Sequence, residues 1–336
     1  MKKFIAIIMS AVILSICFAA CSEQAETAVK TAVTTTQKTT APATTASTTK
    51  PAATNTASTA SSSKASSKSG NSSEKSQNSG NSGGSGGGLS FDFDLDLGPD
   101  YEVKELYSNN GSHSLYGQVY VPENLEGKAP AVVLAHSYLM NGSSLNSLAK
   151  MIANEGMVAY CFDFWGGSLT SRSGGSMSDM TVFTEKDDLK SALATVRSLD
   201  YVDKNKVFLL GTSLGGCVSA LVANDKPSQI KGLILMYPAL LTQEQASEWS
   251  TMADFAGVNW MNDLTDYDVF SHIGGYYGDV LIIHGTADTQ VPIKFSRKAR
   301  DTYSSCRLIE LEGAQHGFTN NSTANYYIKE FLNNHI

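Results

Sequence analysis

One stretch of the chain, from Lys206 to Asp225, constrains the fold more than any other. It reads KVFLLGTSLGGCVSALVAND, in which an apolar run, a Gly-x-Ser-x-Gly turn and a helical pattern follow one another directly. A serine in a sharp strand-to-helix turn stands above the sheet, beside the free N–H groups of the helix N-terminus. The stretch therefore predicts a nucleophile elbow at Ser213, with glycine needed at Gly211 and Gly215 because side chains would clash there.

The Gly-x-Ser-x-Gly pattern by itself is weak. The same chain matches it again at Ser82, in GNSGG, and at Ser85, in GSGGG. Both of these matches lie in a Gly/Ser run with no apolar strand before it and no helical pattern after it. The prediction at Ser213 therefore depends on the strand and helix that flank the turn.

The first 88 residues read as a leader and a tether. Residues 1–21, MKKFIAIIMSAVILSICFAAC, have two lysines, an apolar run and small residues before Cys21, as in a signal peptide. The sequence FAAC resembles a bacterial lipobox, so we expect Cys21 to be lipidated; the alternative is cleavage near Ala20 and free secretion. Residues 22–88 hold no aromatic residue and no Leu, Ile or Met, which predicts a disordered tether.

Residues 89–336 have a globular composition and form the predicted catalytic domain. The first 88 residues hold eight lysines and three glutamates, so this domain is more acidic than the net charge of −7 of the whole chain. An acidic domain argues against nucleic acid as a partner. The domain's cysteines, Cys161, Cys217 and Cys306, fit no metal motif and read as buried small hydrophobes. We expect neither a metal nor a cofactor.

Apolar runs alternate with helical patterns through most of this domain. Continuous apolar strands of this kind predict an α/β fold with a mostly parallel sheet covered by helices on both faces. The strands are expected at 103–107, 115–121, 131–135, 158–162, 207–210, 232–236, 280–283 and 306–311. Helices are expected at about 144–155, 184–198, 214–225, 292–303 and 324–334, the second opened by a capping box over Thr184–Asp187. Residues 91–97 alternate apolar and acidic, and read equally as an edge strand or the end of the tether.

A serine nucleophile needs a base and a carboxylate that orients the base. Of the six histidines, His316 lies in EGAQHGF, the loop between the last strand and the last helix, from which the ring can reach the elbow. His136 and His284 end strands, where imidazoles more often brace loops. Asp288 follows a strand directly, in HGTADTQVP, and is the expected acid; Asp266 and Asp268 are weaker candidates. The order Ser213, Asp288, His316 is that of the α/β-hydrolase fold.

An oxyanion hole requires two N–H donors. The backbone N–H of Leu214, directly after the nucleophile, supplies the first. We expect the second from Tyr138, in the loop that follows the strand 131–135.

Almost the whole of residues 103–336 resembles the α/β-hydrolase superfamily, and is most similar to bacterial feruloyl (cinnamoyl) esterases and dienelactone-hydrolase-like esterases. The matching stretches are LAHSYLMNGSSLNSLAKMIANEGMVAYCFDFWGGS, MTVFTEKDDL, GTSLGG, DVLIIHGTADTQVP and GAQHGF. The resemblance implies Ser213 as nucleophile, Asp288 as acid, His316 as base, and the N–H groups of Tyr138 and Leu214 as oxyanion donors. The chain departs from the family where His136-Ser137 replaces His-Gly, and where Phe164-Trp165-Gly166-Gly167 replaces an Arg- or Asn-containing stretch with Gly-His-Gly. Trp165 then stands either near the substrate or in surface packing.

The segment 240–278 interrupts the strand–helix alternation, and in this fold an insertion there commonly forms a lid over the site. It holds two of the three tryptophans, Trp249 and Trp260, with other aromatic and acidic residues. An aromatic, acidic lid favours a neutral aromatic or apolar acyl group. The alternative is that these aromatics hold the insertion to the core.

The sequence therefore predicts a secreted or cell-surface serine esterase, anchored by lipid to the outer face of the bacterial cytoplasmic membrane or else released. Its substrate is expected to be a small-molecule or polysaccharide-linked ester, with feruloyl esters of plant polysaccharide among the options. One alternative is a serine peptidase of the prolyl-oligopeptidase type, which shares the HGTADTQVP-like stretch. The other is a non-catalytic surface binding module on a hydrolase scaffold.

Overall fold

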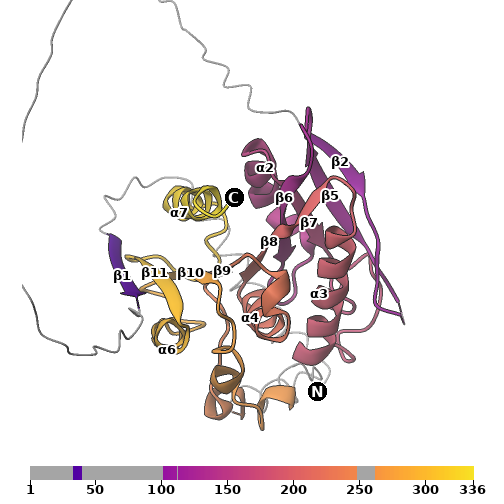
Figure 1. Ribbon diagram of the computed structural model, residues 1–336. Helices are drawn as coiled ribbons and strands as arrows, with labels where there is room; N and C mark the ends of the chain where they lie inside the picture. The colour runs from indigo at the N-terminus through magenta and orange to yellow at the C-terminus, as the bar shows by residue number, and fades with distance from the viewer. Residues whose placement is uncertain (1–32, 40–100, 112, 248–261) are drawn as a thin grey trace, which may run out of the picture. The chain divides into compact units, whose positions relative to one another are not determined.

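The computed structural model describes residues 33–39, 101–111, 113–247 and 262–336 (Figure 1). The expected signal peptide with Cys21, most of the expected tether and the alternating segment 91–97 lie outside these ranges. Residues Val33–Thr39, inside the stretch expected to be a disordered tether, form strand β1, which pairs antiparallel with β11. The division of the chain into leader, tether and catalytic domain stays a prediction.

A nine-stranded sheet organises the described residues, in the order β1-β11-β10-β9-β8-β6-β7-β5-β2. The central strands from β7 to β11 run parallel, while β2, β5 and β1 pair antiparallel at the edges. A separate two-stranded sheet pairs β3 with β4. After β1, the strands are β2 (Tyr101–Glu105), β3 (Ser108–Asn109), β4 (Ser114–Leu115), β5 (Gly117–Pro122), β6 (Ala129–Ala135), β7 (Val158–Phe162), β8 (Val202–Thr212), β9 (Gly232–Met236), β10 (Asp279–Gly285) and β11 (Ser305–Leu311).

Helices cover both faces of this sheet, which confirms the predicted layered architecture. The helices are α2 (Asn146–Asn154), α3 (Val182–Arg197), α4 (Leu214–Asp225), α6 (Lys294–Thr302) and α7 (Ser322–Asn333). Short 3-10 helices are η1 (Gly142–Leu145), η2 (Pro227–Gln229), η3 (Asn262–Leu264) and η4 (Val269–His272). Figure 1 shows α3, α4 and α6 on one side of the sheet and α2 and α7 on the other.

Alternation along each strand divides the core between the two faces. In β6, Val133 packs in a cluster with Leu193 of α3 and Val218 of α4. Val132 packs in a second cluster with Ile152 of α2 and Ile328 of α7. Successive side chains of a strand point to opposite faces, so a continuous apolar run is needed where both faces are covered.

The start of α3 differs from the prediction. The capping box joins Thr181 to Thr184 and helix α3 begins at Val182, so the predicted box over Thr184–Asp187 is wrong. The Thr181 side chain accepts from the Thr184 N–H, and the Thr184 hydroxyl accepts from the Thr181 N–H. This threonine pair satisfies the same backbone donors that a Ser/Thr with Glu would satisfy.

The described part of the insertion 240–278 packs on the helical layer. Tyr276 is buried, and the ring of Tyr267 lies edge-on to Phe183 of α3, with centroids 5.0 Å apart. The Lys298 ammonium of α6 lies 3.9 Å above the ring of Phe270. These aromatics hold the insertion to the core, as the alternative interpretation expects. Trp249 and Trp260 lie outside the described residues.

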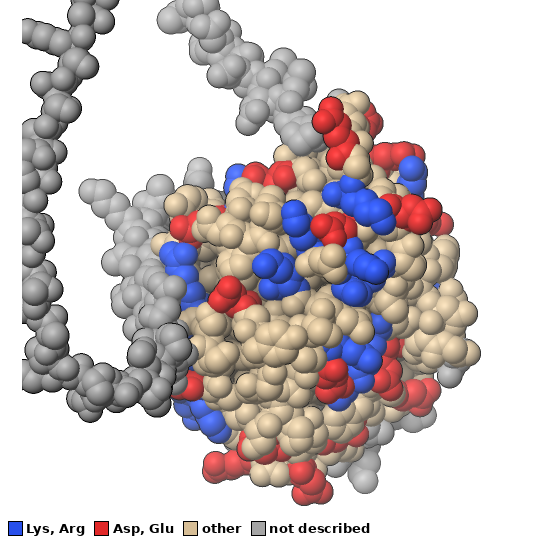
Figure 2. Space-filling model, viewed as in Figure 1, with Lys and Arg blue, Asp and Glu red and all other residues tan. Residues whose placement is uncertain are grey.

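Charges on the face seen in Figure 2 are mixed by sign rather than gathered into one patch. Among the described residues, several charged side chains are ion-paired, for example Arg297 with Glu310 at 2.6 Å and Lys329 with Glu155 at 3.1 Å. Within the described ranges, no helix combines the length and the apolar character needed to cross a membrane.

Candidate active site

Strand β8, Ser213 and helix α4 form the predicted elbow. Ser213 has φ 49° and ψ −116°, a region of backbone space that non-glycine residues rarely adopt. A Cβ at Gly211 would collide with the carbonyl oxygen of Gly215, and one at Gly215 with the carbonyl oxygens of Ala135 and His136. The Ser213 N–H donates to Met236 O at 3.0 Å, which ties the elbow to β9. The strained serine is thus held by close packing of backbone on backbone.

The structure brings Ser213, His316 and Asp288 together at hydrogen-bond distance. His316 Nε2 lies 2.9 Å from Ser213 Oγ, and His316 Nδ1 lies 2.6 Å from Asp288 Oδ2. The three residues follow β8, β11 and β10, whose carboxyl ends share one edge of the sheet. In this geometry His316 can accept the serine proton while Asp288 orients the ring.

The carboxylate of Asp288 is fully buried but well supplied with donors. Its Oδ1 accepts from the N–H groups of Gln290 and Val291, both at 2.9 Å. Its Oδ2 lies near His316 Nδ1 and also 3.1 Å from His284 Nε2. Burial alone would raise the pKa of Asp288, but hydrogen bonds from His284, His316 and Val291 outweigh it and hold the pKa well below its usual value. Asp288 therefore stays ionised at neutral pH.

Tyr237 packs against the side of the His316 ring. Its buried ring lies edge-on to the His316 imidazole, with centroids 4.7 Å apart and planes at 65°. Tyr237 follows β9 directly and has φ 37°. This contact was not predicted from the sequence; a bulky residue directly after a central strand was the available signal.

The predicted oxyanion loop is braced by His136. Its Nε2 accepts from the Phe164 N–H at 3.1 Å, so Nδ1 carries the proton and donates to Ser137 O at 2.8 Å. Burial lowers the pKa of His136 to about 4, against the opposing effect of its bond to Ser137, so the ring is neutral at pH 7. His136 braces a loop, as its position at a strand end suggested.

Ser137 links this loop to the elbow. Its Oγ lies 3.0 Å from Thr212 Oγ1, one residue before the nucleophile. Tyr138 follows in the loop, half-buried, and Leu214 is the first residue of α4. The first N–H groups of a helix have no partner within it, so Leu214 N–H suits the predicted role. Tyr138 N–H remains the predicted second donor.

Trp165 packs between the His113 ring, the Gly174-Gly175 segment and helix α3. Its indole stacks on the His113 ring at 4.1 Å, and a Cβ at Gly175 would lie 2.6 Å from indole Nε1. Its backbone N–H donates to Asp188 Oδ2 of α3 at 2.9 Å. Contact between Trp165 and a substrate stays a prediction, as it does for Trp249 and Trp260.

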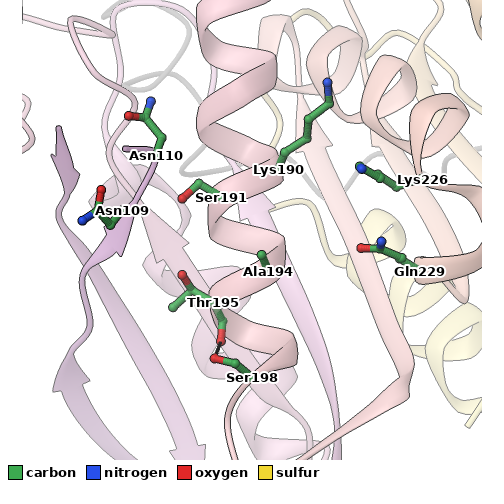
Figure 3. Close-up of a pocket in the computed structure, with 9 residues that line it drawn as sticks. All are labelled: Asn109, Asn110, Lys190, Ser191, Ala194, Thr195, Ser198, Lys226 and Gln229. Atoms are coloured by element: carbon green, nitrogen blue, oxygen red, sulfur yellow. Dashed lines mark hydrogen bonds between the residues drawn. The ribbon is translucent and has the colours of Figure 1, made fainter. Parts of the chain in front are cut away.

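A surface pocket of about 590 Å³ lies apart from the triad, beside α3 (Figure 3). Its lining residues are Asn109, Asn110, Lys190, Ser191, Ala194, Thr195, Ser198, Lys226 and Gln229. Lys190 is ion-paired with Asp225 at 2.8 Å. Since no lining residue belongs to the triad or to the predicted oxyanion donors, this pocket is not the catalytic site.

No group of three or more His, Cys, Asp or Glu side chains is arranged to hold a metal ion among the described residues. Cys161, Cys217 and Cys306 are buried free thiols, as predicted. Burial raises the pKa of Cys217 to about 12, so this thiol is not ionised.

Comparisons with known proteins give partial matches to the sequence of this chain. A family model described as serine aminopeptidase, S33, matches residues 127–265, which include Ser213 but not Asp288 or His316. Monoglyceride lipase of Rattus norvegicus is 34% identical over 109 residues, or 32% of this chain and 35% of the lipase. The match thus spans about a third of that relative's length.

Solved structures match over a longer part of the chain. Est1E from Butyrivibrio proteoclasticus, solved with bound ferulic acid, has a TM-score of 0.62 and 22% identity, covering 68% of this chain and 98% of its own. The α/β hydrolase GrgF from Penicillium sp. sh18 has a TM-score of 0.57 and 14% identity, covering 70% of this chain and 99% of its own. The chain therefore has the α/β-hydrolase fold, with a Ser–His–Asp arrangement at the carboxyl edge of its sheet.

Proposed function

We propose that this chain is a serine esterase that hydrolyses carboxylic esters through an acyl-enzyme on Ser213. The observation that carries the proposal is the hydrogen-bond chain from Ser213 Oγ through His316 to Asp288. His316 takes the hydroxyl proton as Ser213 Oγ attacks the ester carbonyl, and the N–H groups of Leu214 and Tyr138 stabilise the oxyanion. The imidazolium then protonates the leaving alcohol.

Deacylation uses the same groups in reverse roles. His316 takes a proton from water, the resulting hydroxide attacks the acyl carbonyl, and Ser213 leaves with the proton returned by His316. Asp288 stays ionised throughout because four N–H groups surround its carboxylate. No step requires a metal or a cofactor.

Replacement of Ser213 by Ala tests the proposal. We expect kcat/KM for p-nitrophenyl butyrate to fall by at least about 10³-fold, because the nucleophile is lost while the oxyanion donors remain. Wild-type protein should be labelled by a fluorophosphonate and the Ser213→Ala variant should not. Labelling of both proteins, or turnover that persists in the variant, would contradict a nucleophilic Ser213.

The acyl group is proposed to be aromatic, with feruloyl esters of plant polysaccharide as the first candidates. Est1E, whose fold this chain shares, was solved with ferulic acid bound. The matches to a lipase and to an S33 model point to two other substrate classes. A panel of methyl ferulate, p-nitrophenyl acetate, a monoacylglycerol and a prolyl peptide amide separates them. Preference for the amide would favour the peptidase of prolyl-oligopeptidase type, and no turnover with no labelling would favour the binding module.

We also propose that the enzyme acts outside the cell, anchored by a lipid on Cys21. This rests on the leader-like composition of residues 1–21 and on FAAC before the tether. Metabolic labelling with a radioactive fatty acid should mark wild-type protein and not a Cys21→Ser variant.

A further inference from the structure

His284 is a second imidazole on the catalytic carboxylate, and the mechanism above does not use it. It stands near the end of β10 with no exposed surface. Its Nε2 lies 3.1 Å from Asp288 Oδ2 and 2.9 Å from Val291 O. Its Nδ1 lies 2.7 Å from the hydroxyl of Ser296, which is also fully buried, in the first turn of α6. The ring therefore has a polar partner at each nitrogen.

The partners determine which nitrogen carries the proton. Val291 O is a carbonyl and Asp288 is ionised, so both groups near Nε2 only accept hydrogen bonds. Nε2 must therefore carry a proton. In the neutral ring Nδ1 is then an acceptor, and the Ser296 hydroxyl is the donor that fills it. Val291 O and Asp288 thus select the Nε2–H tautomer of His284, and the Ser296 hydroxyl completes it as the donor to Nδ1.

We propose that His284 is a positioning residue for the serine catalysis proposed above: its Nε2–H holds the same Asp288 oxygen that accepts from His316. The result is one continuous chain of contacts, Ser296–His284–Asp288–His316–Ser213. The inference rests on the proposed function, since it assigns a role only if Ser213 and His316 react.

Two effects on His316 follow from the shared oxygen. The N–H of His284 restrains the direction in which Oδ2 points, which keeps His316 aimed at Ser213. It also stabilises the carboxylate charge, which leaves less of that charge to favour the imidazolium form of His316. Loss of this donor should therefore reduce kcat and move the acid limb of the pH profile to higher pH.

Other charges near His284 remain in place when its ring is replaced. Glu310 of β11 lies opposite His284 in the sheet register and is paired with Arg297 of α6 at 2.6 Å. Within the described contacts, Asp288 is the acid hydrogen-bonded to the ring, and His316 lies beyond that carboxylate. A change in the pH profile of a His284 variant therefore reports on the Asp288–His316 pair.

The test compares His284→Phe, which has no donor, with His284→Gln, whose amide can donate to Asp288. For the Phe variant we expect kcat on p-nitrophenyl butyrate to fall about tenfold, with KM within about twofold and the acid limb raised by roughly half a pH unit. The Gln variant should restore kcat to within about threefold of the wild-type value and return the acid limb of the pH profile to its wild-type position. Tyr303→Phe, which removes a buried hydroxyl directly after α6, is the control and should change neither kcat nor the acid limb of the pH profile.

A readout on wild-type protein keeps the proposal testable if His284→Phe does not fold. Nitrogen-15 NMR of histidine-labelled full-length protein should show His284 as the Nε2–H tautomer, and Ser296→Ala should shift its Nδ1 resonance. An Nδ1–H tautomer would overturn the inference. Unchanged kinetics in the Phe variant would also overturn it. So would a loss of kcat that leaves the acid limb of the pH profile in place and that the Gln variant does not restore. Absence of fluorophosphonate labelling in the wild type would instead overturn the proposed function, and the tautomer would still decide the hydrogen bond.

Discussion

Two buried aspartates, Asp288 in the active site and Asp188 on α3, have opposite pKa shifts. Asp288 accepts from two backbone N–H groups and contacts two imidazoles, and its pKa lies below its usual value. Asp188 accepts from the Trp165 N–H and the Asn110 amide, and lies 3.3 Å from His113. Burial raises the pKa of Asp188 to about 6.

The difference comes from donors and neighbours rather than from depth. Both side chains have at most 1% exposure, so desolvation is severe for each. Asp188 has one backbone donor, against two for Asp288, so burial determines its shift; in turn, burial and Asp188 raise the pKa of Glu185, one turn earlier on α3. A buried carboxylate therefore stays charged only where enough N–H groups converge on it.

Replacing each aspartate by asparagine should give the largest difference in kcat/KM between the two sites. We expect Asp288→Asn to lower kcat/KM by at least about 10³-fold at pH 8, because the amide no longer stabilises the imidazolium and favours the wrong His316 tautomer. The matched variant Asp188→Asn should stay within about threefold, because this side chain holds a loop and does not touch the triad. Steady-state kinetics on one ester measures both. Equal losses of kcat/KM in the two variants would show that Asp288 has no role in catalysis beyond that of any buried aspartate.

The pH dependence of stability should distinguish the same two residues. Asp188 has a pKa of about 6 in the folded state against an ordinary value of 3.8, so the folded state holds the proton more tightly between these values. Wild-type stability should therefore fall as pH rises from about 4 to 6 through this group, by on the order of 1–3 kcal/mol. Asp288 acts in the opposite sense, because its contribution is lost only as pH falls through the ordinary range and below.

Urea unfolding of wild type and Asp188→Asn at pH 4, 5, 6 and 7 measures this effect. Relative to wild type, the variant should gain stability as the pH rises through the window, because it lacks the titrating carboxyl. Glu185 is present in both proteins. A difference in unfolding free energy that stays constant from pH 4 to 7 would show that Asp188 does not titrate in this range.

The smallest effect is expected from a neutral contact in the active site. Ser137→Ala removes the hydroxyl pair with Thr212, and should lower kcat about two- to fivefold at every pH, because a neutral hydrogen bond contributes only about 1 kcal/mol. Ser171→Ala is the matched control, since Ser171 Oγ donates to Phe164 O at 2.9 Å in the loop after β7. An equal effect of the two variants on kcat would show that the loop-to-elbow link is not special.

The sequence predicted the sheet and the three triad residues because these depend on local patterns. Apolar runs such as 131–135 and 232–236 can be buried only as covered strands, and the polar residues that follow strands must meet at one edge. The order of Ser213, Asp288 and His316 along the chain then left few ways to combine a nucleophile, an acid and a base. The prediction for the start of α3 was wrong because Thr181 and Thr184 each begin a plausible capping pattern. Which of them caps the helix depends on how the chain enters α3 in the folded structure.

The supporting contacts could not be predicted, because they join residues that the sequence separates. Asp188 meets Asn110 across 78 positions, and Tyr237 meets His316 through the packing of two loops. His284 was expected to brace a loop at a strand end, and nothing in the sequence shows that its ring reaches the carboxylate of Asp288. Ser296 reaches His284 only because α6 presents that side of its first turn to the sheet.

The acid side of this site is a local structure, whereas the base arrives from elsewhere in the chain. The segment 284–296 supplies Asp288, both of its backbone donors, the second imidazole and the hydroxyl that holds that imidazole. A substitution of His284, of Ser296 or of the backbone donors Gln290 and Val291 by proline would therefore change the hydrogen bonding of one carboxylate. The loop 312–317 returns the imidazole to that oxygen and is tied to the same segment, because the Ala287 N–H donates to Ala314 O at 3.1 Å and the Gly313 N–H donates to Thr286 Oγ1 at 2.9 Å.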